Sequence, residues 1–223
     1  MARQRSVFDI VGPVIVGPSS SHTAGAVRLG LLARSIFGTT PVRAIIGLHG
    51  SFASSGRGHG TDLALTAGLL GLFPDDLAIR DSRRLAEEAG LEVSFTAVDL
   101  GRAHPNTAAL DLSAPDRNTI HLRGSSLGGG DVVITRIDSY DVEVTGELPL
   151  LLVAHFDRPG EVAAVTSVLA EGGVNIARMH VSRERRGQKA LMLIETDVPV
   201  GREAVDRISS APGIMSVRVV PSI

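Results

Sequence analysis

The sequence predicts an α+β protein made of two domains. A chain of 223 residues is long enough for one large domain or two smaller ones, at about 100 to 200 residues per domain. Its C-terminal third carries strand and helix signals in the order βαββαβ, whereas its N-terminal part is mixed, with a β-rich end that follows the helices. Apolar residues make up 43% and charged residues 21%, both typical of chains that fold. We therefore expect domains at residues 1–146 and 147–223.

The C-terminal domain has clear hydrophobic periodicity. An apolar run of strand length leads into a turn at residues 157–160, and the helix that follows ends at two glycines. The next strand alternates with one phase slip near Arg178, which predicts a β-bulge. The six elements are expected at residues 148–156, 161–171, 174–182, 190–196, 201–210 and 215–219. This is the split βαβ order of ferredoxin-like domains.

The N-terminal domain is expected to begin with a helix that Ser20 or Ser21 caps and that ends before Gly38. A buried strand follows at residues 42–48. Two more helices are expected at residues 61–70 and 81–89, and shorter β segments at 91–98, 119–123 and 131–144. The class is therefore α+β, with a mixed α/β domain first.

Composition excludes several classes of function. The longest apolar run covers residues 150–154, against the ~20 residues that cross a bilayer, and Asp9 and Pro13 interrupt the apolar start. A net charge of -2 and only six Phe and one Tyr argue against a nucleic-acid partner. We expect no membrane and no nucleic acid, and a cytoplasmic protein with a small-molecule or protein ligand.

Two scarce residue types restrict the chemistry further. The chain has no cysteine, so it forms no disulfide and cannot by itself hold an iron-sulfur cluster through thiolates. Its one lysine, Lys189, lies at an expected hairpin tip, which makes a Schiff base with pyridoxal phosphate implausible. Any iron-sulfur cluster would have to belong to a partner.

Generic catalytic motifs are either absent from the sequence or lie in the wrong structural context. Residues 124–128 match G-x-S-x-G, but β-forming residues follow where the nucleophile elbow needs a helix. There is no H-E-x-x-H and no G-x-x-x-x-G-K, and residues 56–60 lack the last glycine of a dinucleotide fingerprint. Zinc hydrolase, kinase and nicotinamide-dependent functions are therefore not expected.

Three polar loops, at residues 17–23, 49–62 and 104–107, contain four of the seven histidines. The first precedes a helix, where unpaired backbone N–H groups favour an anion such as a carboxylate. Imidazoles beside hydroxyls can move protons near neutral pH. Taken singly, each loop could be only a cap or a turn with a satisfied histidine. The three together favour a site.

The loop sequences resemble a known family. The motifs are GPSSSHT at 17–23, HGSFA at 49–53, GHGTD at 58–62, HPNT at 104–107 and SLGGG at 126–130. Together they resemble the β chain of bacterial iron-sulfur L-serine dehydratases, over nearly the whole chain. The βαββαβ unit, with DRPG at 157–160 and GVNI at 173–176, is similar to the ACT domain that ends such chains. The N-terminal part resembles the allosteric substrate-binding domain of some phosphoglycerate dehydrogenases.

The resemblance implies a two-chain enzyme that deaminates L-serine to pyruvate and ammonia without pyridoxal phosphate. A separate α chain would supply the cysteines of a 4Fe-4S cluster, whose open iron acts as a Lewis acid, so this chain would contribute no metal ligand. The residues carried over as catalytic are Ser20, Ser21, His22, His59, Thr61 and Asn106, and those for substrate binding are Ser19, Thr23 and Thr107. One departure from the family's pattern is Gly25-Ala26, where Gly-Pro is usual, in a helix interior.

Regulation is expected in the ACT domain. The turn before its first helix offers backbone N–H groups to an amino-acid carboxylate, and an asparagine begins the next strand. The residues expected to bind serine as an effector, between two self-associated ACT units, are Asp157, Gly160, Asn175 and Ile176. Which histidine moves a proton stays open. The alternatives are a non-catalytic amino-acid-sensing module and a structural adaptor, neither of which needs three intact histidine loops.

Overall fold

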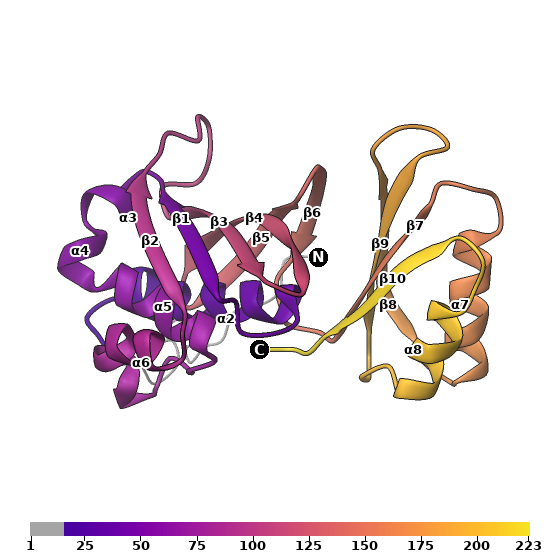
Figure 1. Ribbon diagram of the computed structural model, residues 1–223, viewed down its shortest axis with the longest axis horizontal. Coiled ribbons are helices and arrows are strands. Elements are labelled where there is room, and N and C mark those ends of the chain that lie inside the picture. The colour runs from indigo at the N-terminus through magenta and orange to yellow at the C-terminus, as the bar shows by residue number, and fades with distance from the viewer. Residues whose placement is uncertain (1–15) are drawn as a thin grey trace. The chain divides into compact units, whose positions relative to one another are not determined.

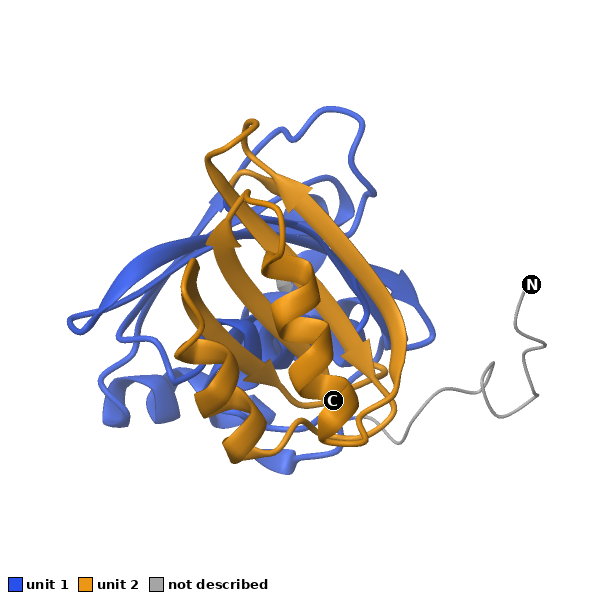
Figure 2. Ribbon diagram, turned by 90° about the vertical axis from the view of Figure 1, so that its right-hand side faces the viewer, with its two compact units in different colours: residues 1–138, 143–145 blue, residues 139–142, 146–223 orange. Residues whose placement is uncertain are grey.

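The computed structural model describes residues 16–223, which divide into two compact units. Among the described residues, the first unit comprises 16–138 and 143–145, and the second comprises 139–142 and 146–223 (Figure 2). The α+β class is confirmed. No helix among the described residues is long and apolar enough to cross a membrane.

A six-stranded sheet forms the centre of the first unit, in the order β2-β1-β3-β4-β5-β6. Strand β1 pairs in parallel with β2 and antiparallel with β3, and the pairs β3–β4 and β4–β5 are antiparallel. Helices gather on one face of this sheet (Figure 1). The strands are β1 (Arg43–Leu48), β2 (Glu92–Ala97), β3 (Thr107–Ala114), β4 (Arg117–Gly128), β5 (Asp131–Ile137) and β6 (Tyr140–Val144). The helices are η1 (Ser20–Ala24), α2 (Gly25–Phe37), α3 (Ser51–Ser54), α4 (Gly56–His59), α5 (Thr61–Leu70), η2 (Leu77–Asp81) and α6 (Ser82–Glu88).

Helices α2 and α5 cross at a pair of glycines. A Cβ on Gly30 would lie 2.5 Å from the carbonyl oxygen of Leu65, and a Cβ on Gly68 would lie 2.1 Å from that of Val27. Only glycine permits backbones to approach so closely. The crossing fixes the start of α5 relative to η1, because η1 leads directly into α2.

The sequence predicted most of these elements but not all. The helix at 61–70 is confirmed, and the segment expected at 131–144 is two strands separated by Asp138, at φ 50°, and Ser139. Strand β3 was missed, since three of its eight residues are alanines of low strand propensity. The loop at 49–62 contains two single-turn helices, α3 and α4. The expected caps Ser20 and Ser21 are wrong by one or two residues, because a π-helical turn precedes α2 and its cap is Ser19.

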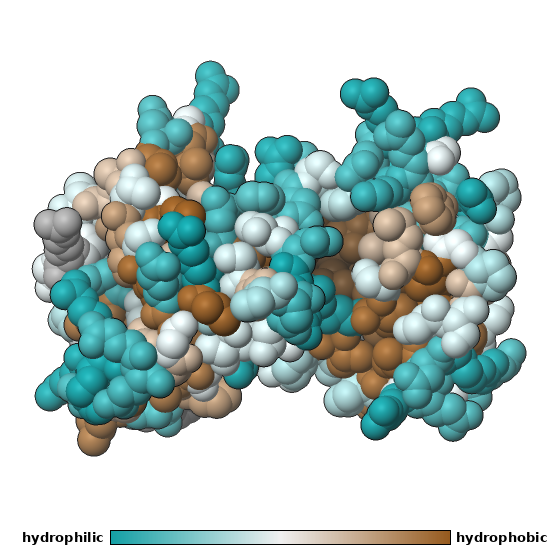
Figure 3. Space-filling model, viewed as in Figure 1, coloured by the Kyte–Doolittle hydropathy of each residue, from teal (hydrophilic) through white to brown (hydrophobic). Residues whose placement is uncertain are grey.

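The second unit has the expected βαββαβ order and a four-stranded sheet arranged β10-β7-β9-β8. Its elements are β7 (Leu150–Phe156), α7 (Glu161–Glu171), β8 (Ile176–Arg183), β9 (Lys189–Thr196), α8 (Arg202–Ser209) and β10 (Ile214–Val220). Helices α7 and α8 cover one face of the sheet (Figure 1), over a core that includes Leu151, Val165 and Ile194. The predicted bulge is confirmed as a register shift between Ile176 and Arg178. Figure 3 shows the tip between β8 and β9 as hydrophilic.

Candidate active site

The first histidine loop is wound into a short π-helix. The Ser19 hydroxyl accepts a hydrogen bond from the backbone N–H of His22 at 3.0 Å, and η1 then runs from Ser20 to Ala24. Single π-helical turns occur often at functional sites, because they re-aim one side chain out of the helical repeat. Ser20, Ser21 and His22 are all half-buried on this turn.

Hydroxyl groups surround the His22 ring. Its Nε2 lies 3.0 Å from Ser51 Oγ and 3.2 Å from Ser55 Oγ, and its Nδ1 lies 3.4 Å from Ser19 Oγ. Ser55 donates its single hydroxyl hydrogen to the carbonyl oxygen of Ser51 at 2.9 Å, so toward His22 it can only accept. We therefore assign the proton of neutral His22 to Nε2. Nδ1 is then the basic nitrogen.

His59 is the neighbour of His22 in space. The two ring centroids are 5.0 Å apart with the planes tilted by 34°. His59 Nδ1 lies 3.0 Å from the carbonyl oxygen of Ser55, which can only accept, so Nδ1 carries the proton and Nε2 is basic. Burial, followed by repulsion from His59, lowers the pKa of His22 below 6.5, and a hydrogen bond with the Ser51 backbone partly opposes this shift. At neutral pH the His22 ring is therefore a neutral proton acceptor.

Two threonines hold the histidine-bearing segments together. Thr61 donates its hydroxyl hydrogen to the carbonyl oxygen of His22 at 3.1 Å, and Thr23 donates to that of His59 at 3.2 Å. Both threonines are buried, so neither bond competes with bulk water. The exchange is reciprocal, and it fixes the spacing between His22 and His59.

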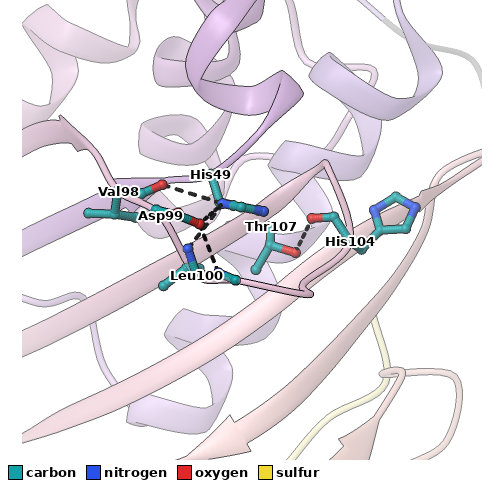
Figure 4. A network of polar contacts seen from close by, with 7 residues as sticks. His49, Val98, Asp99, Leu100, His104 and Thr107 are labelled. Carbon is teal, nitrogen blue, oxygen red and sulfur yellow. Dashed lines mark hydrogen bonds and ion pairs between the residues drawn. The ribbon is translucent and has the colours of Figure 1, made fainter.

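The third loop packs against the second. Gly50, at φ 57°, meets Pro105 so closely that a Cβ there would lie 2.7 Å from the Pro105 carbonyl oxygen. His49 Nδ1 accepts a hydrogen bond from the backbone N–H of Leu100 at 3.1 Å, so this nitrogen is bonded to a neighbouring loop of the protein (Figure 4). His104 is exposed and its ring points away from His49 (Figure 4).

Asn106 and Thr107 lie where this loop enters β3. The Thr107 hydroxyl donates to the carbonyl oxygen of His104 at 2.6 Å and contacts Ser125 Oγ at 2.7 Å, so protein groups already surround it. Asn106 Oδ1 is buried and has no hydrogen-bond partner, and the same holds for Ser126 Oγ on the neighbouring strand β4. Strand β4 continues through the G-x-S-x-G match, so the absence of a nucleophile elbow is confirmed.

The structure thus brings together the predicted residues of the first two loops. Ser51 and Ser55 were not predicted as site residues, although they contact the His22 ring. The sequence signal for these two residues was the SFASS run. Its serines come to lie on one side only after the segment has folded into α3. Spacing i, i+4 then brings the two hydroxyls within 3.1 Å of each other.

Groups that could hold a metal do not assemble in the described part of the chain. Residues 16–223 contain no cluster of three or more His, Asp or Glu side chains placed to bind a metal ion, and the chain has no cysteine. The donors around His22 are neutral hydroxyls, which are poor ligands for iron compared with thiolates. This chain alone therefore does not fit an iron-sulfur cluster.

The predicted effector residues lie around the start of α7 and the start of β8. Gly160 caps α7 at φ 96°, in the left-handed region that suits glycine, and Ile176 begins β8. The Asp157 carboxylate accepts a hydrogen bond from the Gly187 N–H at 2.9 Å, which, together with Arg183, lowers its pKa. Asn175 Nδ2 donates to Asp197 Oδ2 at 2.7 Å. The polar side chains of this region are therefore engaged within the protein.

Comparison with known proteins gives a consistent answer over most of the chain. The sequence model of the family described as "Serine dehydratase beta chain" matches residues 6–136, and that of the ACT domain matches residues 150–213. The probable L-serine dehydratase β chain of Bacillus subtilis is 43% identical over 215 residues, which cover 96% of this chain and 97% of the relative. The L-serine dehydratase β chain of Peptoniphilus asaccharolyticus is 38% identical, over 87% of this chain and 88% of the relative. A D-3-phosphoglycerate dehydrogenase of Methanocaldococcus jannaschii is 36% identical over 88 residues, which are 40% of this chain and 17% of that protein.

Proposed function

This chain belongs to the serine dehydratase β-chain family and ends in an ACT domain, and from this premise we propose that it is the β subunit of a two-chain L-serine dehydratase. The reaction is the conversion of L-serine to pyruvate and ammonia. The Bacillus subtilis and Peptoniphilus asaccharolyticus relatives are both named as β chains, which supports a partner α chain. Because this chain lacks the ligands for a 4Fe-4S cluster, the proposal assigns the cluster to that α chain.

The observation that carries the proposal is the pairing of His22 with His59, with the Ser51 and Ser55 hydroxyls at the His22 ring. Elimination of water from serine requires a base for the Cα proton and an acid for the departing hydroxyl. The ring nitrogens assigned above as unprotonated, His22 Nδ1 and His59 Nε2, can accept the Cα proton. Charge repulsion from His59 is one of the two causes that lower the pKa of His22, so a proton on His59 disfavours a second proton on His22.

The remaining polar groups position the substrate. Ser20 and Ser21 lie on the π-helical turn beside His22, and their hydroxyls can bind the serine carboxylate near the start of a helix. The lowered pKa of His22 suits a base that must be unprotonated at neutral pH. The protonated histidine then gives the proton taken from Cα to the departing hydroxyl, which leaves as water. The enamine product tautomerises to an imine, and hydrolysis of the imine gives pyruvate and ammonia.

The test is reconstitution of this chain with its α chain, followed by an anaerobic serine deaminase assay. His22→Gln and His59→Gln each remove a basic nitrogen but keep a polar side chain of similar size. We expect at least one of them to lower kcat by ~10²-fold or more, the usual contribution of a positioned acid or base. His121→Gln, on an exposed ring elsewhere in the same unit, is the matched control and should keep wild-type kcat.

Four results would contradict parts of this proposal. Near-normal kcat in both variants would make the histidine pair structural. A rise in KM alone would assign the histidines to substrate binding instead of proton transfer. Serine deamination by this chain without any partner, or iron bound to it at stoichiometric level, would refute the two-chain proposal.

For the ACT domain we propose a regulatory role, with serine bound between two self-associated units at the residues around the α7 turn. The backbone at the start of α7, an 11-residue helix, suits a carboxylate. Calorimetry of the full chain with millimolar serine should show binding that Gly160→Leu abolishes, because leucine is strained at φ 96°. Equal binding by Gly160→Leu would remove the sensor role, while leaving the catalytic proposal unchanged.

A further inference from the structure

Three buried side-chain atoms in the described part of the chain have no hydrogen-bond partner: Asn106 Oδ1, Ser126 Oγ and His155 Nε2. His155 belongs to the ACT unit, whereas Asn106 directly precedes β3 and Ser126 lies on the neighbouring strand β4. Buried polar groups almost always have a hydrogen-bond partner, so these two oxygens without one need an explanation. They point to a ligand.

Strand register places Asn106 and Ser126 opposite each other. Thr107 pairs with Ser125, and the backbone N–H of Ser126 donates to the carbonyl oxygen of Asn106 at 2.9 Å, which extends the same ladder by one residue. Side chains of directly opposed residues lie on the same face of a sheet. By alternation this is the face of Ala108, which is fully buried in the core. Asn106 and Ser126 are therefore polar residues at the end of a sheet face that is otherwise apolar and buried.

This polar end lies against the turn that carries His22. A Cβ on Gly25 would lie only 2.0 Å from Ser126 Oγ and 3.3 Å from the carbonyl oxygen of Ser20. Gly25 is the first residue of α2, directly after η1. The Ser126 hydroxyl is therefore packed beneath the π-helical turn, and the residue has no exposed surface.

The chemistry of the two atoms selects the ligand group. The Asn106 carboxamide oxygen can only accept a hydrogen bond, and the Ser126 hydroxyl can accept as well. A carboxylate brings only acceptors and would be repelled by Asn106 Oδ1. An ammonium group brings three donors and a positive charge, which buried oxygens stabilise.

We propose that Asn106 and Ser126 form a subsite for the ammonium group of the amino-acid substrate, an inference that rests on the proposed function. The subsite selects amino acids over the corresponding acids that lack nitrogen. The carboxylate of the substrate binds separately, at the η1 turn. Because the ammonium and the carboxylate are both attached to Cα, holding them at two places fixes the direction of the Cα–H bond relative to the histidines.

The experiment measures binding of L-serine and of 3-hydroxypropionate, which is serine without its amino group, to the assembled two-chain protein by calorimetry. Ser126→Ala should weaken L-serine binding by ~10-fold or more and leave 3-hydroxypropionate binding unchanged. Because it removes an unsatisfied buried hydroxyl, it should not lower the Tm of the unliganded protein. Asn106→Ala should give the same selective loss.

The matched control is Ser125→Ala. Ser125 is the adjacent buried serine, and its Oγ is already bonded to Thr107 at 2.7 Å, so this variant should lower the Tm and leave serine affinity unchanged. Equal loss for both ligands in Ser126→Ala would overturn the ammonium assignment. No loss for either would mean that only a buried water occupies the pair and would also overturn it. Serine binding without turnover would refute the proposed function alone, and no serine binding by the wild-type assembly would refute both.

Discussion

A single methyl group at Gly68 tests whether the α2–α5 crossing holds the candidate active site together. In Gly68→Ala the new Cβ would lie 2.1 Å from the Val27 carbonyl oxygen, where an ordinary contact begins at 3.4 Å. The helices must therefore separate by roughly 1.3 Å, the difference between these two distances. Overpacking of this kind costs ~1 to 3 kcal/mol of the free energy of unfolding. Because the contacted atom belongs to the backbone of α2 and cannot move aside by a side-chain rotation, we expect a cost near the upper end of this range.

The alanine also has a favourable effect, because it raises helix propensity by ~1 kcal/mol over glycine. The net expectation is a loss of ~2 kcal/mol in the free energy of unfolding, or a fall in Tm of ~4 to 8 °C for a unit of this size. Separation of the helices also moves Thr61 away from the His22 carbonyl, now 3.1 Å from its hydroxyl, so kcat of the assembled enzyme should fall too.

Thermal unfolding followed by circular dichroism measures the first effect. Gly58→Ala is the control, because a Cβ at Gly58 would meet no atom within 4 Å. Its Tm should stay the same or rise, so the two substitutions are expected to have opposite signs. A Gly68→Ala protein as stable as Gly58→Ala would refute the idea that close backbone contact fixes this crossing.

The other predictions concern pH. Because burial and His59 lower the pKa of His22, the unfolded chain binds more protons than the folded one just below pH 6.5, so the free energy of unfolding should decrease as the pH falls through this range. Denaturation of His22→Gln should show a smaller decrease, and parallel pH profiles would contradict the assignment. The opposite sign applies to His121, whose pKa is raised chiefly by its hydrogen bond with Asp111, so its stabilisation is present below pH 6.5 and is lost as the pH rises through the raised pKa. An NMR titration should find a lower His121 pKa in Asp111→Asn than in the wild type, and an unchanged value would remove the Asp111 interaction as the cause.

Local sequence signals predicted the fold where each element has its own periodicity. The helix at 61–70 and the bulge near Arg178 are examples, since both follow from the spacing of apolar side chains. Strand β3 is the opposite case, because its alanines have little strand preference and only pairing with β1 and β4 makes it a strand. The turn at η1 also escaped prediction, as a π-helical turn has no distinct residue pattern.

The candidate site likewise has features that follow from the sequence and features that depend on the folded structure. The sequence by itself determined which loops carry histidines and hydroxyls, that no thiolate is available, and that the chain ends in a βαββαβ unit, since these follow from residue types and local spacing. Only the tertiary structure decided that His22 pairs with His59 instead of His49 or His104, and that Ser51 and Ser55 contact the His22 ring. Those contacts join residues about 30 to 40 positions apart, and their geometry depends on backbone packing at the α2–α5 crossing. Which nitrogen of each ring is basic depends in turn on hydrogen bonds to a carbonyl and a hydroxyl, and such bonds exist only after the loops are folded against one another.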